Sequence, residues 1–161
     1  MQLFIRDANL GDHEAIETLY READTIAHEL LPRFFKHPIE FGRDKEEFLR
    51  QIQDKSTALI VAEDDRGVIG LSMTVLQQTS ASLHDGFARR TYAELVNLIL
   101  SSAARREGIA SKLVATAENW AKSSGAESID LTVVEGNGGA QQLYENFGFF
   151  MRSHRMWKLL D

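Results

Sequence analysis

The second half of the chain contains a strand-like run, a tight basic turn and a helix-like run in direct succession. This order constrains the fold more than any other feature. The strand predicted for residues 90–100 ends in the apolar run from Leu95 to Leu100, and apolar positions then recur at helical spacing through residues 108–124. Between them, residues 105–110 read Arg-Arg-Glu-Gly-Ile-Ala. A strand that enters a helix through so short a turn predicts an α/β arrangement.

The turn itself has the composition of an anion site. The first N–H groups of a helix have no partners within the helix, and the helix dipole favours negative charge there. Gly108 allows the backbone to approach a phosphate closely, while Arg105 and Arg106 add positive charge. The pattern is neither a Walker A loop nor a dinucleotide-binding fingerprint. The turn alone is equally compatible with a plain capped helix start.

Periodic patterns predict the remaining elements. Apolar and polar residues alternate, or recur at helical spacing, along most of the chain. They predict strands at 3–5, 58–62, 68–76, 90–100, 128–134, 149–150 and 155–160, and helices at 12–31, 44–53, 108–124 and 137–148. The resulting order, β-α-α-β-β-β-α-β-α-β-β, predicts a mixed α/β fold with about seven strands in a mostly antiparallel sheet and helices on both faces.

Composition limits the possible functions. The 161 residues suit a single domain, 1–161, without linkers or repeats. The absence of cysteine excludes disulfides and thiolate chemistry and fits a cytoplasmic protein, while the five histidines lack metal-ligand spacing, so we expect no metal. A net charge of −6 argues against general binding to nucleic acid. No apolar stretch approaches the ~20 residues of a membrane span, so we expect no membrane association.

A second motif, from Asn137 to Phe149, reads Asn-Gly-Gly-Ala-Gln-Gln-Leu-Tyr-Glu-Asn-Phe-Gly-Phe. With the turn at 105–110, it resembles the signatures of the GNAT superfamily of acyl-CoA-dependent N-acetyltransferases. The family's pyrophosphate loop has the form Gln/Arg-x-x-Gly-x-Gly/Ala, and its later signature is Asn-x-x-Ala-x-x-Leu-Tyr-Glu-x-x-Gly-Phe. Arg106 departs from the resemblance, since the family commonly has Gly there, and this puts the detailed loop geometry in question.

The resemblance implies a GNAT fold with a V-shaped splay between the fourth and fifth strands, where acetyl-CoA would bind. The pantetheine arm would pair with the backbone of the fourth strand, and the pyrophosphate would lie on the loop and the start of the following helix. The family's acceptor pocket would involve residues at about 25–40 and 77–92. The implied cofactor-binding residues are Leu98, Ile99, Leu100, Arg105, Arg106, Glu107, Gly108, Ile109, Ala110, Ser111, Asn137 and Tyr144.

Two residues are catalytic candidates by the same resemblance. Tyr144 would be the general acid that protonates the departing thiolate, and the alternative is a core aromatic anchored by its hydroxyl. Glu94 would be the general base that removes a proton from the amine, and the alternative is a solvated strand carboxylate. A β-bulge at Asn97 or Leu98 would polarise the thioester carbonyl.

The resemblance thus predicts an enzyme that transfers an acetyl group directly from acetyl-CoA to a primary amine of a small molecule or peptide. Two alternatives remain: a non-catalytic acyl-CoA sensor or interaction module on the same fold, and a related acyl transfer to a hydroxyl or with a longer acyl chain. The acceptor is not identified by any pattern in the chain. A homodimer is a further possibility, because dimers are common in such folds.

Overall fold

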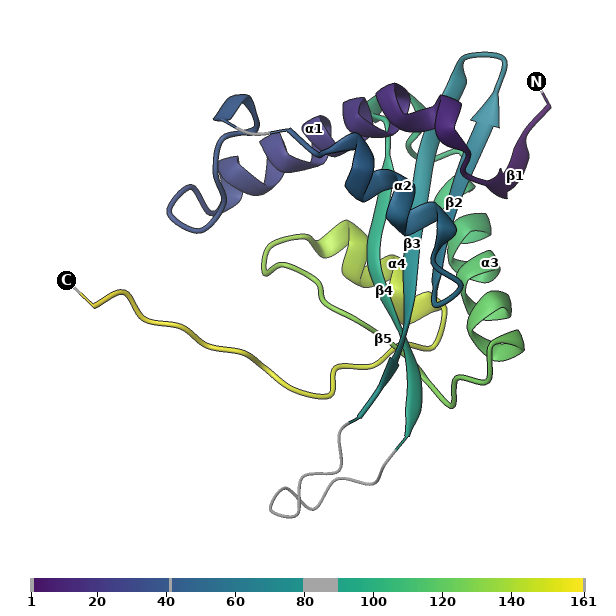
Figure 1. Ribbon diagram of the computed structural model, residues 1–161. Coiled ribbons are helices and arrows are strands. Elements are labelled where there is room, and N and C mark those ends of the chain that lie inside the picture. Colours follow the sequence, from purple (N-terminus) through teal and green to yellow (C-terminus); the bar gives the residue numbers. More distant parts are fainter. Residues whose placement is uncertain (1, 41, 80–89, 161) are drawn as a thin grey trace.

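The computed structural model describes residues 2–40, 42–79 and 90–160, and within these ranges it contains one five-stranded sheet (Figure 1). The strands lie in the order β1-β2-β3-β4-β5, all neighbours being antiparallel except β4 and β5, which are parallel. The strands are β1 (Phe4–Asp7), β2 (Thr57–Asp64), β3 (Gly67–Gln78), β4 (Thr91–Leu100) and β5 (Ile129–Leu131). The α-helices are α1 (His13–Leu30), α2 (Lys45–Gln53), α3 (Ile109–Ser123) and α4 (Gly138–Asn146).

Helices cover both faces of the sheet, as the sequence predicted. On one side, α1 and α2 lie over a buried cluster of Ile16, Leu19, Tyr20, Phe48, Leu59, Val61, Leu71 and Ile99. On the other side, α3 covers Ala58, Ile60, Ala62, Ile69, Ala104, Ile109 and Leu113. There α4 adds Leu143, Tyr144 and Phe147 against Leu95, Val114 and Ala117. We refer to these sides as the α1/α2 face and the α3/α4 face.

The apolar run of β2 shows how the sequence produces these two layers. Leu59 and Val61 point to the α1/α2 face, whereas Ala58, Ile60 and Ala62 point to the α3/α4 face. Successive side chains of this strand point to opposite faces, and both faces are buried. The strand therefore needs apolar residues at successive positions. The centre of β3 is also buried on both faces, with Leu71, Ser72 and Thr74 almost fully buried, although two of these three residues are polar.

An extra residue interrupts the centre of β4. Met73 lies opposite Asn97 whereas Thr74 lies opposite Leu95, so Val96 is inserted as a β-bulge. The parallel pairing between β4 and β5 ends at the same point, with Leu95 opposite Leu131. The two strands therefore part beyond Leu95, where divergence of the fourth and fifth strands was expected.

The seven-strand prediction was wrong, because residues 149–150 and 155–160 form no strand. The observed order among the described residues is β-α-α-β-β-β-α-β-α. The segment from 149 to 160 carries residues that favour strands, but a strand also needs a partner. In the described chain the one backbone hydrogen bond of this segment runs from the Phe149 N–H to the Tyr144 carbonyl at the end of α4 and joins it to no strand. The fifth strand is also shorter than predicted, since it covers Ile129–Leu131 rather than 128–134.

Candidate active site

The turn before α3 forms a cradle of backbone N–H groups. Gly108 precedes the helix with a φ of 75°, in the left-handed region that favours glycine. The helix hydrogen bonds begin only with the N–H of Lys112, which donates to the carbonyl of Gly108 at 3.4 Å. The N–H groups of Ile109, Ala110 and Ser111 are therefore left at the positive end of the helix dipole.

Arg106 also adopts a left-handed conformation, with a φ of 68°. Among the described residues it is the only non-glycine with positive φ. This backbone strains an L-residue, by about 1–2 kcal/mol. The strain explains why a glycine suits this position. In this chain the position carries arginine, whose side chain is exposed beside the cradle.

Glu107 fixes the loop from outside. Its carboxylate accepts a 2.8 Å bond from Arg66, whose guanidinium also lies 2.6 Å from Asp64 and bonds the carbonyl of Ala103. The Arg66 guanidinium lowers the pKa of Glu107. Glu107 was predicted among the cofactor-binding residues; its side chain is paired with Arg66 of the β2–β3 turn, and cofactor binding through its backbone stays a prediction.

The backbone of β4 beyond the bulge has one edge without a strand partner. The N–H of Ser101 points to β3, since it donates to the carbonyl of Ile69 at 2.9 Å. Because the N–H and C=O groups of successive residues point to opposite edges of a strand, those of Ile99, two residues earlier, also point to β3. The peptide groups of Leu98 and Leu100 face the other way, toward the side from which β5 has departed. Of these three predicted residues, Leu98 and Leu100 have their backbone groups on the open edge and Ile99 has its backbone groups toward β3; cofactor binding at each of them stays a prediction.

Asn137 begins α4. Its side-chain oxygen accepts a hydrogen bond from the N–H of Ala140 at 3.2 Å and so caps the helix. Its amide NH₂ makes no hydrogen bond to another described residue. The cap leaves the NH₂ as the group that a ligand can bind.

Tyr144 lies on the α3/α4 face, next to the point where β4 and β5 part. Its ring packs with Leu95 and Val114 and meets Phe149 edge to face at 5.7 Å between centroids. Burial raises the pKa of the Tyr144 hydroxyl, which therefore stays protonated at neutral pH. No hydrogen bond joins this hydroxyl to another described residue, so it is not an anchor within the described core.

Glu94 lies on the opposite side of the sheet from Tyr144. Leu95 points into the cluster on the α3/α4 face, so alternation directs its neighbour Glu94 to the α1/α2 face. Glu94 is half-buried and forms no ion pair with another described residue. The structure therefore does not bring Glu94 and Tyr144 into contact, but places them on either side of the parting strands.

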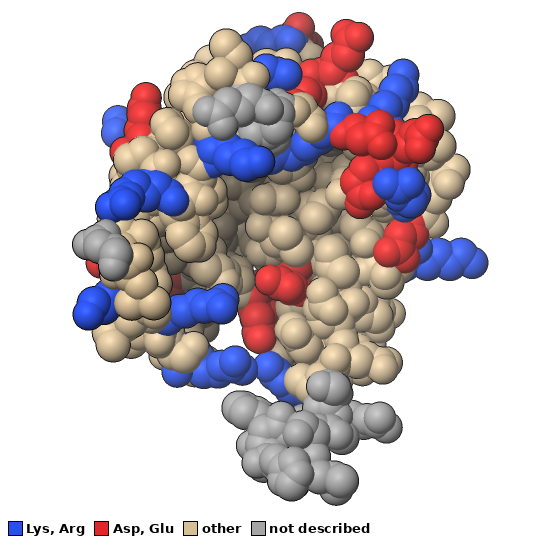
Figure 2. All heavy atoms as spheres, turned by 60° about the vertical axis from the view of Figure 1, so that its left-hand side comes forward, with Lys and Arg blue, Asp and Glu red and all other residues tan. Residues whose placement is uncertain are grey.

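The expected acceptor region is only partly within the described chain, since residues 80–89 lie outside it. A hollow of about 330 Å³ is lined by Asp24, Phe34, Phe35 and Lys36. Figure 2 shows that this side of the molecule is hollowed. Lys and Arg side chains lie along one rim of the hollow, and acidic side chains lie near its lower end in this view.

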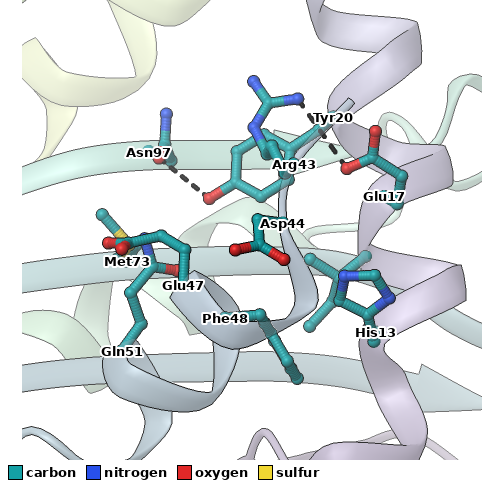
Figure 3. A pocket seen from close by; sticks show the side chains of 11 residues that line it. His13, Glu17, Tyr20, Arg43, Asp44, Glu47, Phe48, Gln51, Met73 and Asn97 are labelled. Carbon is teal, nitrogen blue, oxygen red and sulfur yellow. Dashed lines mark hydrogen bonds and ion pairs between the residues drawn. The ribbon is translucent and has the colours of Figure 1, made fainter. Parts of the chain in front are cut away.

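A second cavity, of about 200 Å³, lies between α1, α2 and the middle of the sheet (Figure 3). The Tyr20 hydroxyl donates to Oδ1 of Asn97 at 3.0 Å across its floor, and the Arg43 guanidinium lies over the Tyr20 ring at 3.9 Å from the centroid. Burial is the main cause that raises the pKa of Tyr20 to about 12. Carboxylates of Glu17, Asp44 and Glu47 complete the polar lining.

The sequence analysis did not identify this cavity. One signal for it was present, because Asn97 is a polar residue within the apolar run from Leu95 to Leu100. The structure shows that Asn97, directly after the bulge, points to the α1/α2 face and bonds Tyr20. Nε2 of His13, another lining residue, is buried without a hydrogen-bond partner in the described chain.

In residues 2–40, 42–79 and 90–160, no group of three or more His, Asp or Glu side chains is arranged to hold a metal ion. Within the same ranges, no helix combines the length and the apolar character that crossing a membrane requires.

Comparison with solved structures supports the fold along the whole chain. A mutant of the BH1408 protein from Bacillus halodurans is 20% identical with a TM-score of 0.88, covering 98% of this chain and 99% of that one. A transcriptional regulator from Bacillus halodurans C-125 is 25% identical with a TM-score of 0.74, covering 99% and 100%. Aminoglycoside N-acetyltransferase AAC(6')-Iy, in complex with CoA, is 17% identical with a TM-score of 0.70, covering 98% and 99%.

Sequence comparison gives the family directly. No curated protein matches the chain. A model of the acetyltransferase (GNAT) family, however, matches residues 18–149. This match spans most of the first helix, all but the first strand of the sheet, the pyrophosphate-type turn and the Asn137–Phe149 motif, and it shows that the chain belongs to the GNAT acetyltransferase family.

Proposed function

We propose that this chain is an enzyme that transfers an acetyl group from acetyl-CoA directly to a primary amine. The observation that carries the proposal is the open edge of β4, which continues past the end of its pairing with β5 and leads to the N–H cradle before α3. An extended ligand with an anionic end fits this combination, because the edge offers strand-like hydrogen bonds and the cradle binds phosphate.

The residues fit acetyl-CoA in one orientation. The pyrophosphate lies on the N–H groups of residues 106–111, with the exposed Arg105 and Arg106 beside it, and the pantetheine pairs with Leu98 and Leu100. The NH₂ of Asn137 is available to the same arm from α4. Bound in this way, acetyl-CoA supplies a reactive thioester at the level of the bulge.

The remaining roles follow from the two faces of the sheet. The Leu98 N–H, which faces the open edge, donates to the thioester carbonyl. Glu94 accepts the proton that an amine must lose, since an alkyl ammonium with a pKa near ~10 is not a nucleophile at neutral pH. Tyr144 donates its proton to the departing sulfur. The amine therefore approaches from the α1/α2 face, and the thiol departs on the α3/α4 face.

The acceptor is a small-molecule amine that carries positive charge. The cavity on the α1/α2 face has three carboxylates in its lining, and its single cation, Arg43, is paired with Asp24 at 2.8 Å. Aminoglycoside acetyltransferases share this fold, which makes polycationic amines the first class to test. Peptide amines are the second class.

The test measures acetyl-CoA-dependent thiol release over aminoglycosides, polyamines and peptide amines. We expect Tyr144→Phe to lower kcat about 100-fold, because general acid catalysis contributes at least that much, and to leave the Kd for CoA unchanged. Glu94→Gln should lower kcat similarly, whereas the matched Glu118→Gln on α3 should not. A chain that binds CoA but acetylates none of these amines would contradict the proposal and favour a sensor of acyl-CoA.

A further inference from the structure

The exposed part of the turn before α3 has no backbone hydrogen bonds to hold its shape. Ala104 and Ile109 are buried at its two ends, and the four residues between them are exposed. In the described chain, none of the N–H groups of residues 105–111 donates to another residue. Unpaired N–H groups are what an anion needs, but they leave the turn without a ladder that fixes their directions.

Arg66, on the β2–β3 turn, supplies contacts that the backbone lacks. Its guanidinium donates to the two oxygens of Glu107, at 2.8 and 3.2 Å, and to the carbonyl of Ala103 at 3.2 Å. On its other side it donates to Asp64, at 2.6 and 3.0 Å. These contacts use all five N–H donors of an arginine side chain. Arg66 is the only residue outside the turn that bonds any of residues 103–107 within the described parts of the chain.

A buried carboxylate keeps this arginine in place. Asp64 is buried at the end of β2, and it also accepts a 2.8 Å bond from the backbone N–H of Arg66. An isolated ion pair on the surface would hold a loop only weakly. Here the charge of Asp64 is costly to leave unpaired, so the guanidinium stays beside it and fixes the position of Glu107.

Glu107 needs such a role, because a carboxylate beside an anion site repels the anion. The residue before it, Arg106, has a φ of 68°, a conformation that persists only where the surrounding structure enforces it. The fork between Arg66 and Glu107 lies one residue further along the chain. It therefore restrains the turn next to its strained position and at the same time compensates the charge of the carboxylate.

We propose that Arg66 is a positioning residue for the cofactor. Through Glu107 and the carbonyl of Ala103 it holds the N–H cradle in the conformation that receives the pyrophosphate of acetyl-CoA. The inference rests on the proposed function, since it needs a ligand with a pyrophosphate at this turn. Arg66 has no donor left for that ligand, so it acts only through the turn. Its loss lowers the fraction of molecules with a formed cradle, and the Kd for CoA rises by the inverse of that fraction.

The first experiment replaces the fork without removing its charge. Arg66→Lys keeps a cation beside Asp64, but an ammonium cannot span two carboxylates and a carbonyl as a guanidinium does. The Kd for CoA, measured by calorimetry, should rise about tenfold, the scale of one lost charge-assisted hydrogen bond. The KM for acetyl-CoA should rise equally, and kcat with the amine that is acetylated fastest should stay unchanged. Arg50→Lys, in an exposed pair with Glu47 on α2, is the matched control and should alter neither constant.

The second experiment uses the sign of an effect. Glu107→Ala removes a negative charge beside the anion site, which by itself would tighten CoA binding. We expect weaker binding, because the tether to Arg66 is lost, and the fold should survive, because Glu107 is exposed. The two substitutions together should weaken binding little more than either alone, since they break the same contact.

Three results would overturn the inference alone: an unchanged Kd in Arg66→Lys, tighter CoA binding in Glu107→Ala, or a lower kcat with an unchanged KM. In each case CoA binding by the unaltered chain would still support the proposed function. An unaltered chain that binds no CoA would overturn both.

Discussion

Deletion of Val96 should close the open edge of β4 without disturbing the rest of the sheet. With Val96 removed, Leu95, opposite Thr74, directly precedes Asn97, opposite Met73. All the remaining pairs between β3 and β4 therefore keep their register. The side chains keep their faces too, because Leu95 and Asn97 already point to opposite sides. The deletion therefore removes a bulge and leaves an ordinary antiparallel ladder.

The effect on β5 follows from the order of peptide groups along β4. A parallel ladder needs outward-facing groups at alternate residues, and the groups of Ala93 and Leu95 meet this need. The bulge places the next outward residue, Leu98, one position too far along the chain. Without Val96 the alternation is restored, and β5 can pair beyond Leu131, through the residues up to 134 that already have a strand-like pattern.

The expected magnitude is the loss of one hydrogen bond that the Leu98 carbonyl accepts from pantetheine and one that the Leu100 peptide group makes with it. Two backbone bonds at about 1 kcal/mol each amount to about 2 kcal/mol, or roughly thirty-fold in the Kd for CoA. Titration calorimetry measures this change, and hydrogen exchange should show new protection at residues 132–134. Val96→Ala retains the bulge and should bind CoA normally, because the Val96 side chain is 41% exposed. A deletion variant that does not fold would refute the register argument, and one with unchanged Kd would refute the open edge.

Two further predictions concern stability. Burial raises the pKa of Tyr20 to about 12, so its contribution to the free energy of unfolding is complete below pH 10 and is lost as the pH rises through 12. Tyr20→Phe should therefore lower the free energy of unfolding, measured in urea, by about 1–2 kcal/mol at pH 8. At pH 11 this loss should be about 1.4 kcal/mol smaller. An equal loss at both pH values would show that burial does not raise the pKa of Tyr20. Arg106→Gly should relieve the left-handed backbone and raise the free energy of unfolding by up to about 1 kcal/mol. The same substitution should weaken CoA binding. A lower midpoint of thermal unfolding in the variant would contradict the strain inferred at Arg106.

Local patterns predicted most of the fold, and their failures have physical causes. The helical spacing of Ile16, Leu19 and Tyr20 placed α1 correctly, because it reports a face that must be buried. The strand predicted for 128–134 shortened to Ile129–Leu131 since its length depends on the ladder with β4. Val96, the residue that ends this ladder, is an ordinary strand former and gives no local signal.

The candidate site divides in the same way. The turn at 105–110 and the Asn137–Phe149 motif were recognisable because their residues act through nearby backbone, as the φ of Gly108 and the cap by Asn137 show. The partner of Glu107 could not be foreseen, because Arg66 belongs to a turn distant in sequence. The cavity at Asn97 likewise depends on Tyr20, which belongs to a helix distant in sequence.

Two irregular positions of the backbone, Val96 and Arg106, lie at either end of the run that we assign to acetyl-CoA. At Val96 the strand gives up a regular ladder, and at Arg106 the turn adopts a conformation that costs an L-residue about 1–2 kcal/mol. Each irregularity leaves peptide groups without a partner inside the protein. Regular geometry at both positions would stabilise the fold, but it would also pair the groups that a ligand needs. Irregular backbone at both ends of one binding path is expected where selection for binding opposes selection for stability.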